Sequence, residues 1–191
     1  MEFQDVVRKR RMVRRFQADR PVPKEVLDRI LHNATRGPSA GFSQGQAFLV
    51  LQGEDLAKFW ALRPHGNGVS TAPLLIVPLS CKRVYLDRYA EPDKGWTDRD
   101  EARWPVPFWH IDTGMATLLI LQTAVDQGLG ALYFGIQPED VGPFRERYGV
   151  PDDHEPIGAI AIGYSDEPEQ SGSPKSRTRR PVDEVVHHGR W

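Results

Sequence analysis

Residues 111–128 constrain the fold most, because they predict a helix that is apolar around most of its circumference. The apolar side chains of this segment include Met115, Leu118, Leu119, Leu121 and Val125. A helix that is apolar on nearly every side is either central in a domain or part of a dimer core. The other elements of the chain must therefore be arranged around this helix or against a second copy of it.

Shorter patterns before and after this helix predict both helices and strands. Helices are expected at residues 2–11, 23–36, 56–62 and 138–148, and strands at residues 47–52, 74–80, 131–136 and 156–164. The chain has 191 residues, of which 39% are hydrophobic, and this length suits one domain with a buried core. We therefore expect a single domain that spans residues 1–191.

A basic segment near the N-terminus is the first candidate for function. Six of the eight residues 8–15 are Arg or Lys, although the formal net charge of the chain is only −1. If the first helix continues, Arg10 and Arg14 share a face; if the chain becomes extended near Met12, Arg10, Met12 and Arg14 point the same way. Both geometries let Arg10 and Arg14 bind one phosphate. The alternative is a solvated basic helix end, where cations complement the helix dipole.

A second basic cluster lies near the C-terminus, after a polar linker at residues 166–176. It consists of Lys175, Arg177, Arg179 and Arg180. Two basic clusters at opposite ends of one chain require either a common anionic partner or a common solvent-exposed face. Charge alone does not decide between these two alternatives.

Two irregular segments are further candidates for a binding site. Residues 38–46 carry hydroxyl and amide groups directly before a predicted buried strand, so they form either a ligand-binding loop or an ordinary connection. Residues 82–107 lose periodicity and are rich in charge, proline and aromatic residues. A segment of this length inside a compact domain is usually functional or mobile. Its aromatic rings could stack on a planar ligand, or pack on the domain or on a second subunit.

Several classes of protein lack their motifs in this sequence. There is no GxxxxGK[ST] phosphate loop, no Rossmann glycine pattern, no HExxH metal motif and no G-x-S-x-G serine nucleophile. We expect no metal site. Cys81, the only cysteine, ends an apolar run and is expected to be a buried small residue, typical of a protein in a reducing compartment. The sequence shows no signal peptide or membrane-spanning segment, so we expect a cytoplasmic protein.

The order of short motifs resembles the FMN-dependent nitroreductase family. The resemblance begins at Arg10-Arg11-Met12-Val13-Arg14-Arg15-Phe16 and Pro21-Val22-Pro23, and continues through Gly37-Pro38-Ser39-Ala40-Gly41 and Ser43-Gln44. It resumes at Asp112 and the long helix, Gly128-Leu129-Gly130, residues 157–164 and residues 177–187. It implies an α+β nitroreductase-like fold, with a central, mostly antiparallel sheet flanked by helices, in a domain-entwined homodimer.

The same resemblance implies a set of cofactor-binding residues. Arg10 and Arg14 would meet Arg177 and Arg179 on the FMN phosphate, and Arg11 and Met12 of the same segment are further cofactor-binding residues. Pro38, Ser39, Ala40, Phe42 and Gln44 would reach the flavin of the other subunit, so that the site lies at the subunit interface. Leu132, Tyr133, Phe134 and Gly135 would pass the flavin ring, with a backbone N–H near Phe134 or Gly135 directed at N5. Residues 82–107 would form a loop-rich excursion that caps the site.

The function implied is an FMN-dependent NAD(P)H oxidoreductase. Hydride would pass by a ping-pong mechanism through the flavin to a nitroaromatic, a quinone or another small acceptor, and no catalytic side chain is expected because the flavin carries the chemistry. The sequence does not choose between NADH and NADPH. The family usually has Ser at the position of Met12 and Asn at that of Phe42, and the usual Pro-Trp is replaced by Gly45-Gln46.

Two other functions remain as alternatives. One is a flavin-binding protein with a non-redox, storage or sensing role, which the departures at Met12 and Phe42 would permit. The other is nucleic-acid binding through the arginine clusters, against which the net charge of −1 and the isoelectric point of about 6.6 argue. We therefore expect no nucleic-acid partner and no membrane partner.

Overall fold

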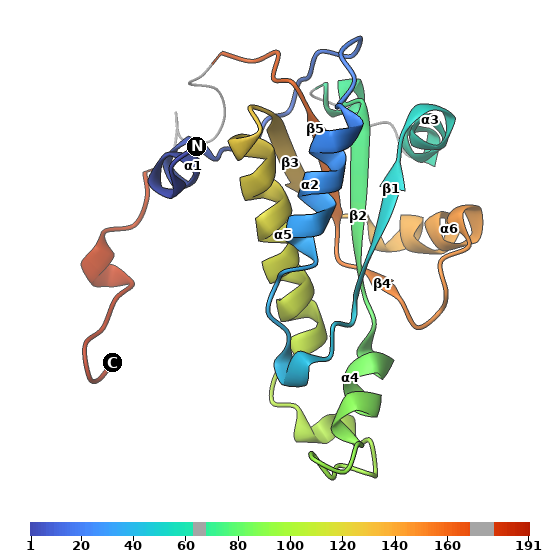
Figure 1. Ribbon diagram of the computed structural model, residues 1–191, viewed down its shortest axis with the longest axis vertical. Coiled ribbons are helices and arrows are strands. Elements are labelled where there is room, and N and C mark those ends of the chain that lie inside the picture. Colours follow the sequence, from blue (N-terminus) through green and yellow to red (C-terminus); the bar gives the residue numbers. More distant parts are fainter. Residues whose placement is uncertain (63–67, 169–177) are drawn as a thin grey trace.

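The computed structural model describes residues 1–62, 68–168 and 178–191 (Figure 1). The helices are α1 (Phe3–Lys9), α2 (Lys24–Ala34), α3 (Gly53–Leu62), α4 (Lys82–Tyr89), α5 (Phe108–Asp126) and α6 (Pro138–Tyr148). The strands are β1 (Gln46–Leu51), β2 (Leu74–Ser80), β3 (Gly130–Phe134), β4 (Glu155–Pro156) and β5 (Ala159–Gly163). Helices and strands thus lie within a few residues of the positions that the hydrophobic patterns predict, apart from α4.

The strands form one sheet in the order β1-β2-β5-β3, with β4 paired to β2. All the strand pairs are antiparallel, for example Leu49 with Val77 and Leu132 with Ala161. Every residue of β2 and β5 is buried, as expected for central strands that read as continuous apolar runs. The predicted α+β class with a mostly antiparallel sheet is therefore confirmed.

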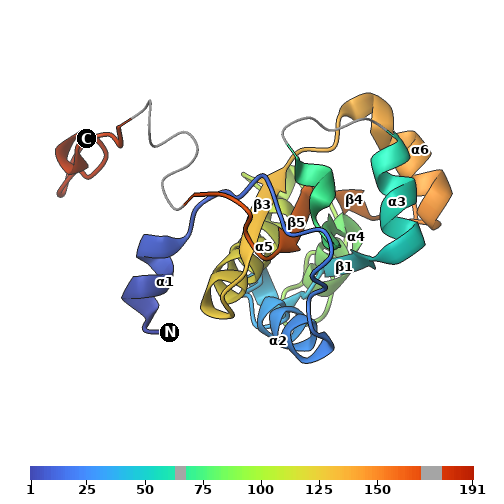
Figure 2. The same cartoon turned by 90° about the horizontal axis from the view of Figure 1, so that it is seen from above.

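Helices cover both faces of the sheet (Figures 1 and 2). On one face, Leu74 and Ile76 of β2 pack with buried residues of α2 and α5. On the other face, Leu75 and Val77 pack with Phe59 of α3 and Phe144 of α6. Alternate side chains of a strand point to opposite faces, so one apolar strand supplies both halves of the core.

Helix α5 is central to the fold, as its apolar sequence predicts. Nine of its residues are buried, among them Ala116, Ile120 and Ala124, and the helix packs against α2, β2 and β3. Its remaining face is exposed and apolar, with Ile111, Met115 and Leu118 at 38%, 42% and 46% exposure. This spacing of four and then three residues places the three side chains on one side of the helix. A single copy of the chain leaves this stripe uncovered.

The expectation of a segment without regular structure at residues 82–107 is wrong for its first third. Residues 82–89 form α4, and Glu101–Arg103 form a single 3₁₀ turn. The helix contains one buried residue, Tyr85, and the segment closes on itself through ring contacts of Tyr89, Trp96 and Trp104. Long-range contacts of these aromatic residues stabilise a helix whose own sequence has little apolar periodicity.

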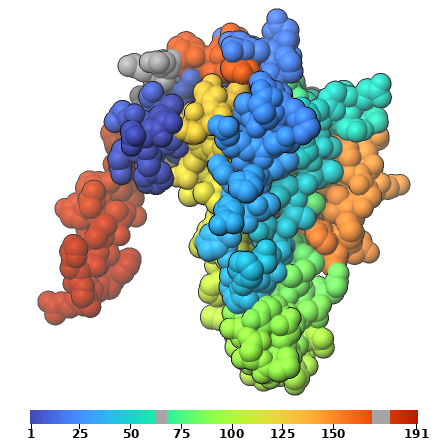
Figure 3. Space-filling model, viewed as in Figure 1, coloured from blue at the N-terminus to red at the C-terminus, as the bar shows by residue number. Residues whose placement is uncertain are grey.

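The C-terminal residues 178–191 are exposed throughout and extend away from the body of the molecule on the side of α1 (Figures 1 and 3). This arm carries large exposed apolar side chains, including Val182 at 72% and Trp191 at 98% exposure. Within the part of the chain that is described, no helix is both long enough and apolar enough to cross a membrane.

Candidate functional site

The basic segment adopts the extended alternative. Helix α1 ends at Lys9, and Met12 forms a parallel β-bridge with Ala131 at the open edge of β3. Met12 packs with the core on the α2–α5 face, whereas Val13 is buried in the core on the α3–α6 face. Side chains alternate along an extended segment, so Arg10, Met12 and Arg14 share one side. The spacing of these arginines therefore matches a site for one anion.

Arg11 lies on the other side and already has an acidic partner. Its guanidinium is 2.8 Å from the Glu167 carboxylate, whose other oxygen accepts hydrogen bonds from the backbone N–H groups of Arg14 and Arg15 at 2.5 and 2.9 Å. Glu167 thus fixes the backbone of the basic segment and partly neutralises Arg11. Arg11 was predicted to bind the cofactor together with Arg10 and Arg14, but its geometry differs from theirs.

Arg10 and Arg14 have no carboxylate partner among the residues that the structure describes. The Arg14 guanidinium donates a hydrogen bond to the Met12 carbonyl oxygen, at 3.4 Å. Both side chains are only partly exposed. Two arginines on one side of the segment, without acidic partners in the described part of the chain, give a region of positive potential that suits a phosphate.

Strand β3 connects the basic segment to the predicted ring-binding residues. Next to the bridge at Ala131, the backbone N–H of Tyr133 points at the Met12 sulfur, with 3.5 Å between nitrogen and sulfur. The Tyr133 hydroxyl group is bonded to the carbonyl oxygen of Ile157, which fixes its ring over Gly158. In the described part of the chain, the N–H of Gly135 donates no hydrogen bond. A backbone donor is therefore available where the sequence predicts one for the flavin.

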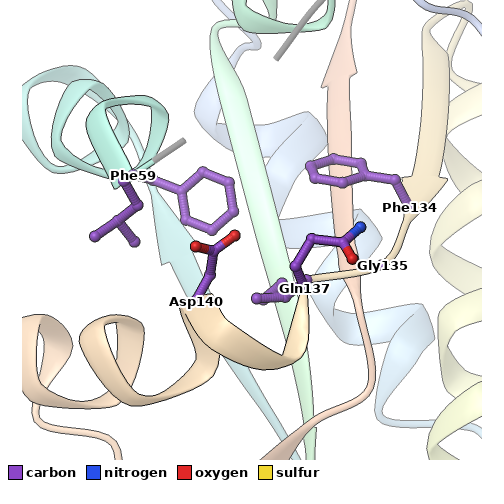
Figure 4. Close-up of a pocket in the computed structure, with 7 residues that line it drawn as sticks. Phe59, Phe134, Gly135, Gln137 and Asp140 are labelled. Atoms are coloured by element: carbon purple, nitrogen blue, oxygen red, sulfur yellow. The ribbon is translucent and has the colours of Figure 1, made fainter. Parts of the chain in front are cut away.

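A cavity of about 280 Å³ adjoins this donor (Figure 4). Phe59 of α3 and Phe134 of β3 extend toward each other across it, with 6.4 Å between ring centroids, and Gln137 and Asp140 at the start of α6 supply polar atoms. Of the predicted site residues that the structure describes, Phe134 and Gly135 line it. Sequence analysis missed the others, because α3 and α6 are distant in sequence and neither carries a motif.

The predicted binding loop is held at its base by a buried carboxyl group. Asp112 of α5, which is 4% exposed, accepts hydrogen bonds from the Ala40 backbone N–H and from the Tyr85 hydroxyl group, both at 2.8 Å. Burial raises the pKa of Tyr85, and the bond to Asp112 raises it further. Asp112 thereby links α5, α4 and the loop, a role that the sequence did not indicate.

Tyr85→Phe should lower the free energy of unfolding at pH 7 by roughly 1–3 kcal/mol, because Asp112 loses one of its donors in a buried site. Urea denaturation measures this difference. Because the pKa of Tyr85 is higher in the folded than in the unfolded protein, the free energy of unfolding of the wild type should fall above about pH 10. The difference in free energy of unfolding between the wild type and the variant should narrow over the same range. Tyr148→Phe is the control, because its hydroxyl group bonds the Asp55 carbonyl oxygen near the surface. Equal stability of both variants would contradict the role of Asp112.

The structure separates the predicted site residues into two groups. The N-terminal ammonium group pairs with Asp126 at the end of α5, next to the basic segment, whereas the Ala40 loop is bonded to Asp112 at its start. Fourteen residues of helix separate these anchors, which corresponds to about 21 Å. One chain therefore does not bring Pro38, Ser39, Ala40, Phe42 and Gln44 together with Arg10 and Arg14.

The second basic cluster is only partly described. Arg179 is exposed on the C-terminal arm, and Arg177 lies outside the described residues. In this chain the arm lies on the same side of the molecule as α1 but apart from it, and its described residues do not pack on the body of the molecule (Figure 2). The expected meeting of the two basic clusters on one phosphate remains a prediction.

One other cluster has the composition of a metal site. Cys81, Asp153 and His154 have their ligand atoms within 4.8 Å of one another. Arg83 already donates a hydrogen bond to Asp153, at 2.8 Å from Nε, and this contact lowers the pKa of the carboxyl group to about 2. Burial raises the pKa of the Cys81 thiol. A protonated thiol and a guanidinium group both disfavour a bound cation. Cys81 is buried, as predicted.

Fold and site together define an α+β protein with a basic segment bridged to the edge strand of its sheet. The model of the nitroreductase family matches residues 7–65 and 61–164. The chain belongs to the nitroreductase family, so the resemblance read from the sequence is confirmed. A protein of Methanothermobacter thermautotrophicus named as an NADH dehydrogenase/NAD(P)H nitroreductase is 32% identical over 167 residues, which are 86% of this chain and 78% of that protein.

Solved structures agree with this assignment. A nitroreductase family protein of Clostridium difficile is 27% identical, with a TM-score of 0.75 and complete coverage of both chains. A nitroreductase of Exiguobacterium sibiricum, solved in complex with FMN, is 20% identical, with a TM-score of 0.77 over 98% of this chain and 97% of that one. The second match supports the fold, and the predicted nitroreductase-like fold is confirmed.

Proposed function

We propose that the protein is an FMN-dependent oxidoreductase that accepts electrons from NADH or NADPH and passes them to a small acceptor such as a nitroaromatic or a quinone. Family membership confirms the enzyme class, and relatives named for FMN and NAD(P)H support the cofactors. The ping-pong mechanism and the kind of acceptor are part of the proposal.

The observation that carries the proposal is the pair of guanidinium groups beside the edge strand. Arg10 and Arg14 share one side of the extended segment, and neither has a carboxylate partner in the part of the chain that is described. The bridge between Met12 and Ala131 joins this segment to β3, which leads to the N–H of Gly135. Charge at one end of the strand and a backbone donor at the other suit a ligand with a phosphate and a polar ring, such as FMN.

Each group has a defined task in this arrangement. FMN, when bound, supplies the reversible two-electron chemistry. Arg10 and Arg14 hold the phosphate by charge-assisted hydrogen bonds, and Arg179 on the arm adds to this charge. The N–H of Gly135 donates a hydrogen bond to the ring, and a backbone donor needs no particular side chain. Met12 has a thioether where the family has a hydroxyl group, and a thioether cannot donate a hydrogen bond to the phosphate. In the proposed site the arginines therefore supply most of the binding energy.

The proposed assembly is a homodimer with one site at each end of the α5 pair. The exposed stripe of Ile111, Met115 and Leu118 is the surface that a second copy would cover. A Cβ atom at Gly114, within this stretch, would meet no atom of the same chain within 4 Å. A two-fold antiparallel pairing of α5 places the start of one helix beside the end of the other. The Ala40 loop of one chain then approaches the basic segment of its partner.

Absorption spectroscopy tests the proposed function. Protein incubated with FMN and desalted should retain a yellow chromophore, and anaerobic addition of NADH or NADPH should bleach it. Protein that retains no flavin would overturn the choice of cofactor. A retained flavin that neither nucleotide bleaches would instead favour the non-redox flavin protein.

A further inference from the structure

The loop that contains Phe42 has a backbone conformation that its sequence does not favour. Gly41, Phe42 and Gln44 have φ angles of 61°, 57° and 55°, in the left-handed region. A bulky residue such as phenylalanine rarely adopts this conformation, because its Cβ atom crowds the backbone. Such strain persists only where the surrounding structure imposes it.

Contacts on every side impose this conformation. In addition to the bond from the Ala40 N–H to Asp112, the Arg88 guanidinium donates a hydrogen bond to the Gly41 carbonyl oxygen at 2.9 Å. A Cβ atom at Gly41 would lie 2.6 Å from the Tyr89 ring, and one at Gly45 would lie 2.5 Å from the Tyr85 ring. The excursion at residues 82–107 therefore supports the loop through α4 and leaves no room for another backbone path.

The strained turn presents a ring that its own chain does not use. The Phe42 side chain is 77% exposed, although Ser43 and Gly45 beside it are buried. An exposed ring contributes little to the stability of its own fold, and a left-handed backbone lowers that stability. Contacts within the described part of the chain therefore do not explain why a phenylalanine stands at this position.

The location of the loop indicates where that contact is made. Ala40 is bonded to Asp112, the residue after Ile111, so the loop that carries Phe42 lies at the start of α5, where the apolar stripe of Ile111, Met115 and Leu118 begins. The Arg10 and Arg14 segment of the same chain lies near the other end of α5. If a second copy covers the stripe, Phe42 enters the site of that copy.

We propose that Phe42 of one subunit covers the ring-binding part of the partner's site and selects flat, uncharged aromatic acceptors, such as quinones, over compact charged ones. The proposal rests on the proposed FMN-dependent function. A phenyl ring stacks on a planar ligand in an offset or edge-on arrangement and excludes water from it. It offers no hydrogen bond to an ionic acceptor. The rigid turn keeps the ring in place before the ligand arrives, which lowers the entropic cost of binding.

Binding of 1,4-naphthoquinone to the oxidised, FMN-loaded protein tests this selection without turnover. Perturbation of the flavin absorption spectrum gives the dissociation constant. Phe42→Ala should raise this dissociation constant by roughly three- to tenfold, which corresponds to the loss of one ring contact. Phe42→Leu should raise the dissociation constant less. The ratio of the rate of naphthoquinone reduction to the rate of ferricyanide reduction should fall in Phe42→Ala, because ferricyanide has no aromatic ring for Phe42 to contact. Phe3→Ala removes an equally large ring that is 63% exposed on α1 and serves as the control.

A mixed dimer tests whether Phe42 acts across the interface. A chain with Phe42→Ala, Arg10→Ala and Arg14→Ala is co-expressed with a differently tagged wild-type chain, and the heterodimer is purified. The FMN site that keeps Arg10 and Arg14 is then the one in the wild-type chain, and the partner of that chain carries Phe42→Ala. If Phe42 acts from the partner, this site should have the naphthoquinone affinity of the Phe42→Ala homodimer. Wild-type affinity in the heterodimer would overturn the proposal.

Two further results separate this proposal from others. Wild-type protein that binds no FMN, or whose flavin is not bleached, contradicts the proposed function itself. Wild-type protein that binds and bleaches FMN, with unchanged naphthoquinone affinity in Phe42→Ala, contradicts only the role of Phe42. The free energy of unfolding of Phe42→Gly should equal or exceed that of the wild type, since glycine relieves the backbone strain. A large loss of stability would instead show a structural role.

Discussion

Replacing Arg10 and Arg14 together by alanine should weaken FMN binding by more than about a hundredfold. In the proposed site each guanidinium group supplies a charge-assisted hydrogen bond to the phosphate, worth about 1.5–3 kcal/mol, and every 1.4 kcal/mol corresponds to a factor of about ten. Both side chains share one side of the extended segment, and Glu167 fixes its backbone. Isothermal titration with FMN measures the change, and circular dichroism verifies that the fold is retained.

Two single variants serve as controls for this prediction. Arg15→Ala removes a guanidinium group that is 57% exposed and bonded to Asp166, so FMN affinity should be unchanged. Arg11→Ala should have a smaller effect than the double variant, because the Arg11 charge is partly neutralised by Glu167. A double variant that binds FMN as tightly as the wild type would rule out the phosphate assignment.

Leu118→Glu should convert the proposed dimer to a monomer at micromolar concentration. Leu118 is 46% exposed in a single chain, so the change should alter monomer stability by about 0.5 kcal/mol or less. In a two-fold interface the same change occurs twice, and each buried carboxylate without a partner costs several kcal/mol. Light scattering coupled to size-exclusion chromatography measures the molar mass. The monomer should also lose FMN, since the site needs both chains.

The control for this variant is Val106→Glu. Val106 is 42% exposed and lies outside the α5 stripe, so this variant should keep the dimer mass and FMN binding of the wild type. If Leu118→Glu remains a dimer, the two copies do not meet at this stripe. If it becomes a monomer that still binds FMN tightly, the site is complete within one chain.

Much of the fold could be predicted from local patterns in the sequence. The apolar run that forms β2 and the helical periodicity of α5 both specify elements without reference to distant residues. Helix α4 was missed because its one buried side chain, Tyr85, is held by Asp112 and by aromatic residues beyond the helix. Contacts of this kind leave no periodic signal within a short segment.

The candidate site was predicted less completely, also for physical reasons. The sequence left two geometries open for Arg10 and Arg14, and only the bridge from Met12 to Ala131 selects the extended one. The pairing of Arg11 with Glu167 spans 156 residues, so no local spacing reveals it. The role proposed for the Ala40 loop depends on a second chain, and the roles of Arg177 and Arg179 depend on a C-terminal arm whose described residues are exposed throughout; all of these roles remain predictions.

The two anchors on α5 also limit how a chain of this kind can change in length. Asp112 holds the Ala40 loop at one end of the helix, and Asp126 holds the N-terminus at the other. One residue inserted between them would rotate one anchor relative to the other by about 100° and move it by about 1.5 Å. Residues 90–107 contain only a single helical turn and are attached to α4 mainly through the rings of Trp96 and Trp104, so the stretches between these rings could change in length with less disturbance. Insertions and deletions among related sequences should therefore accumulate there and spare α5.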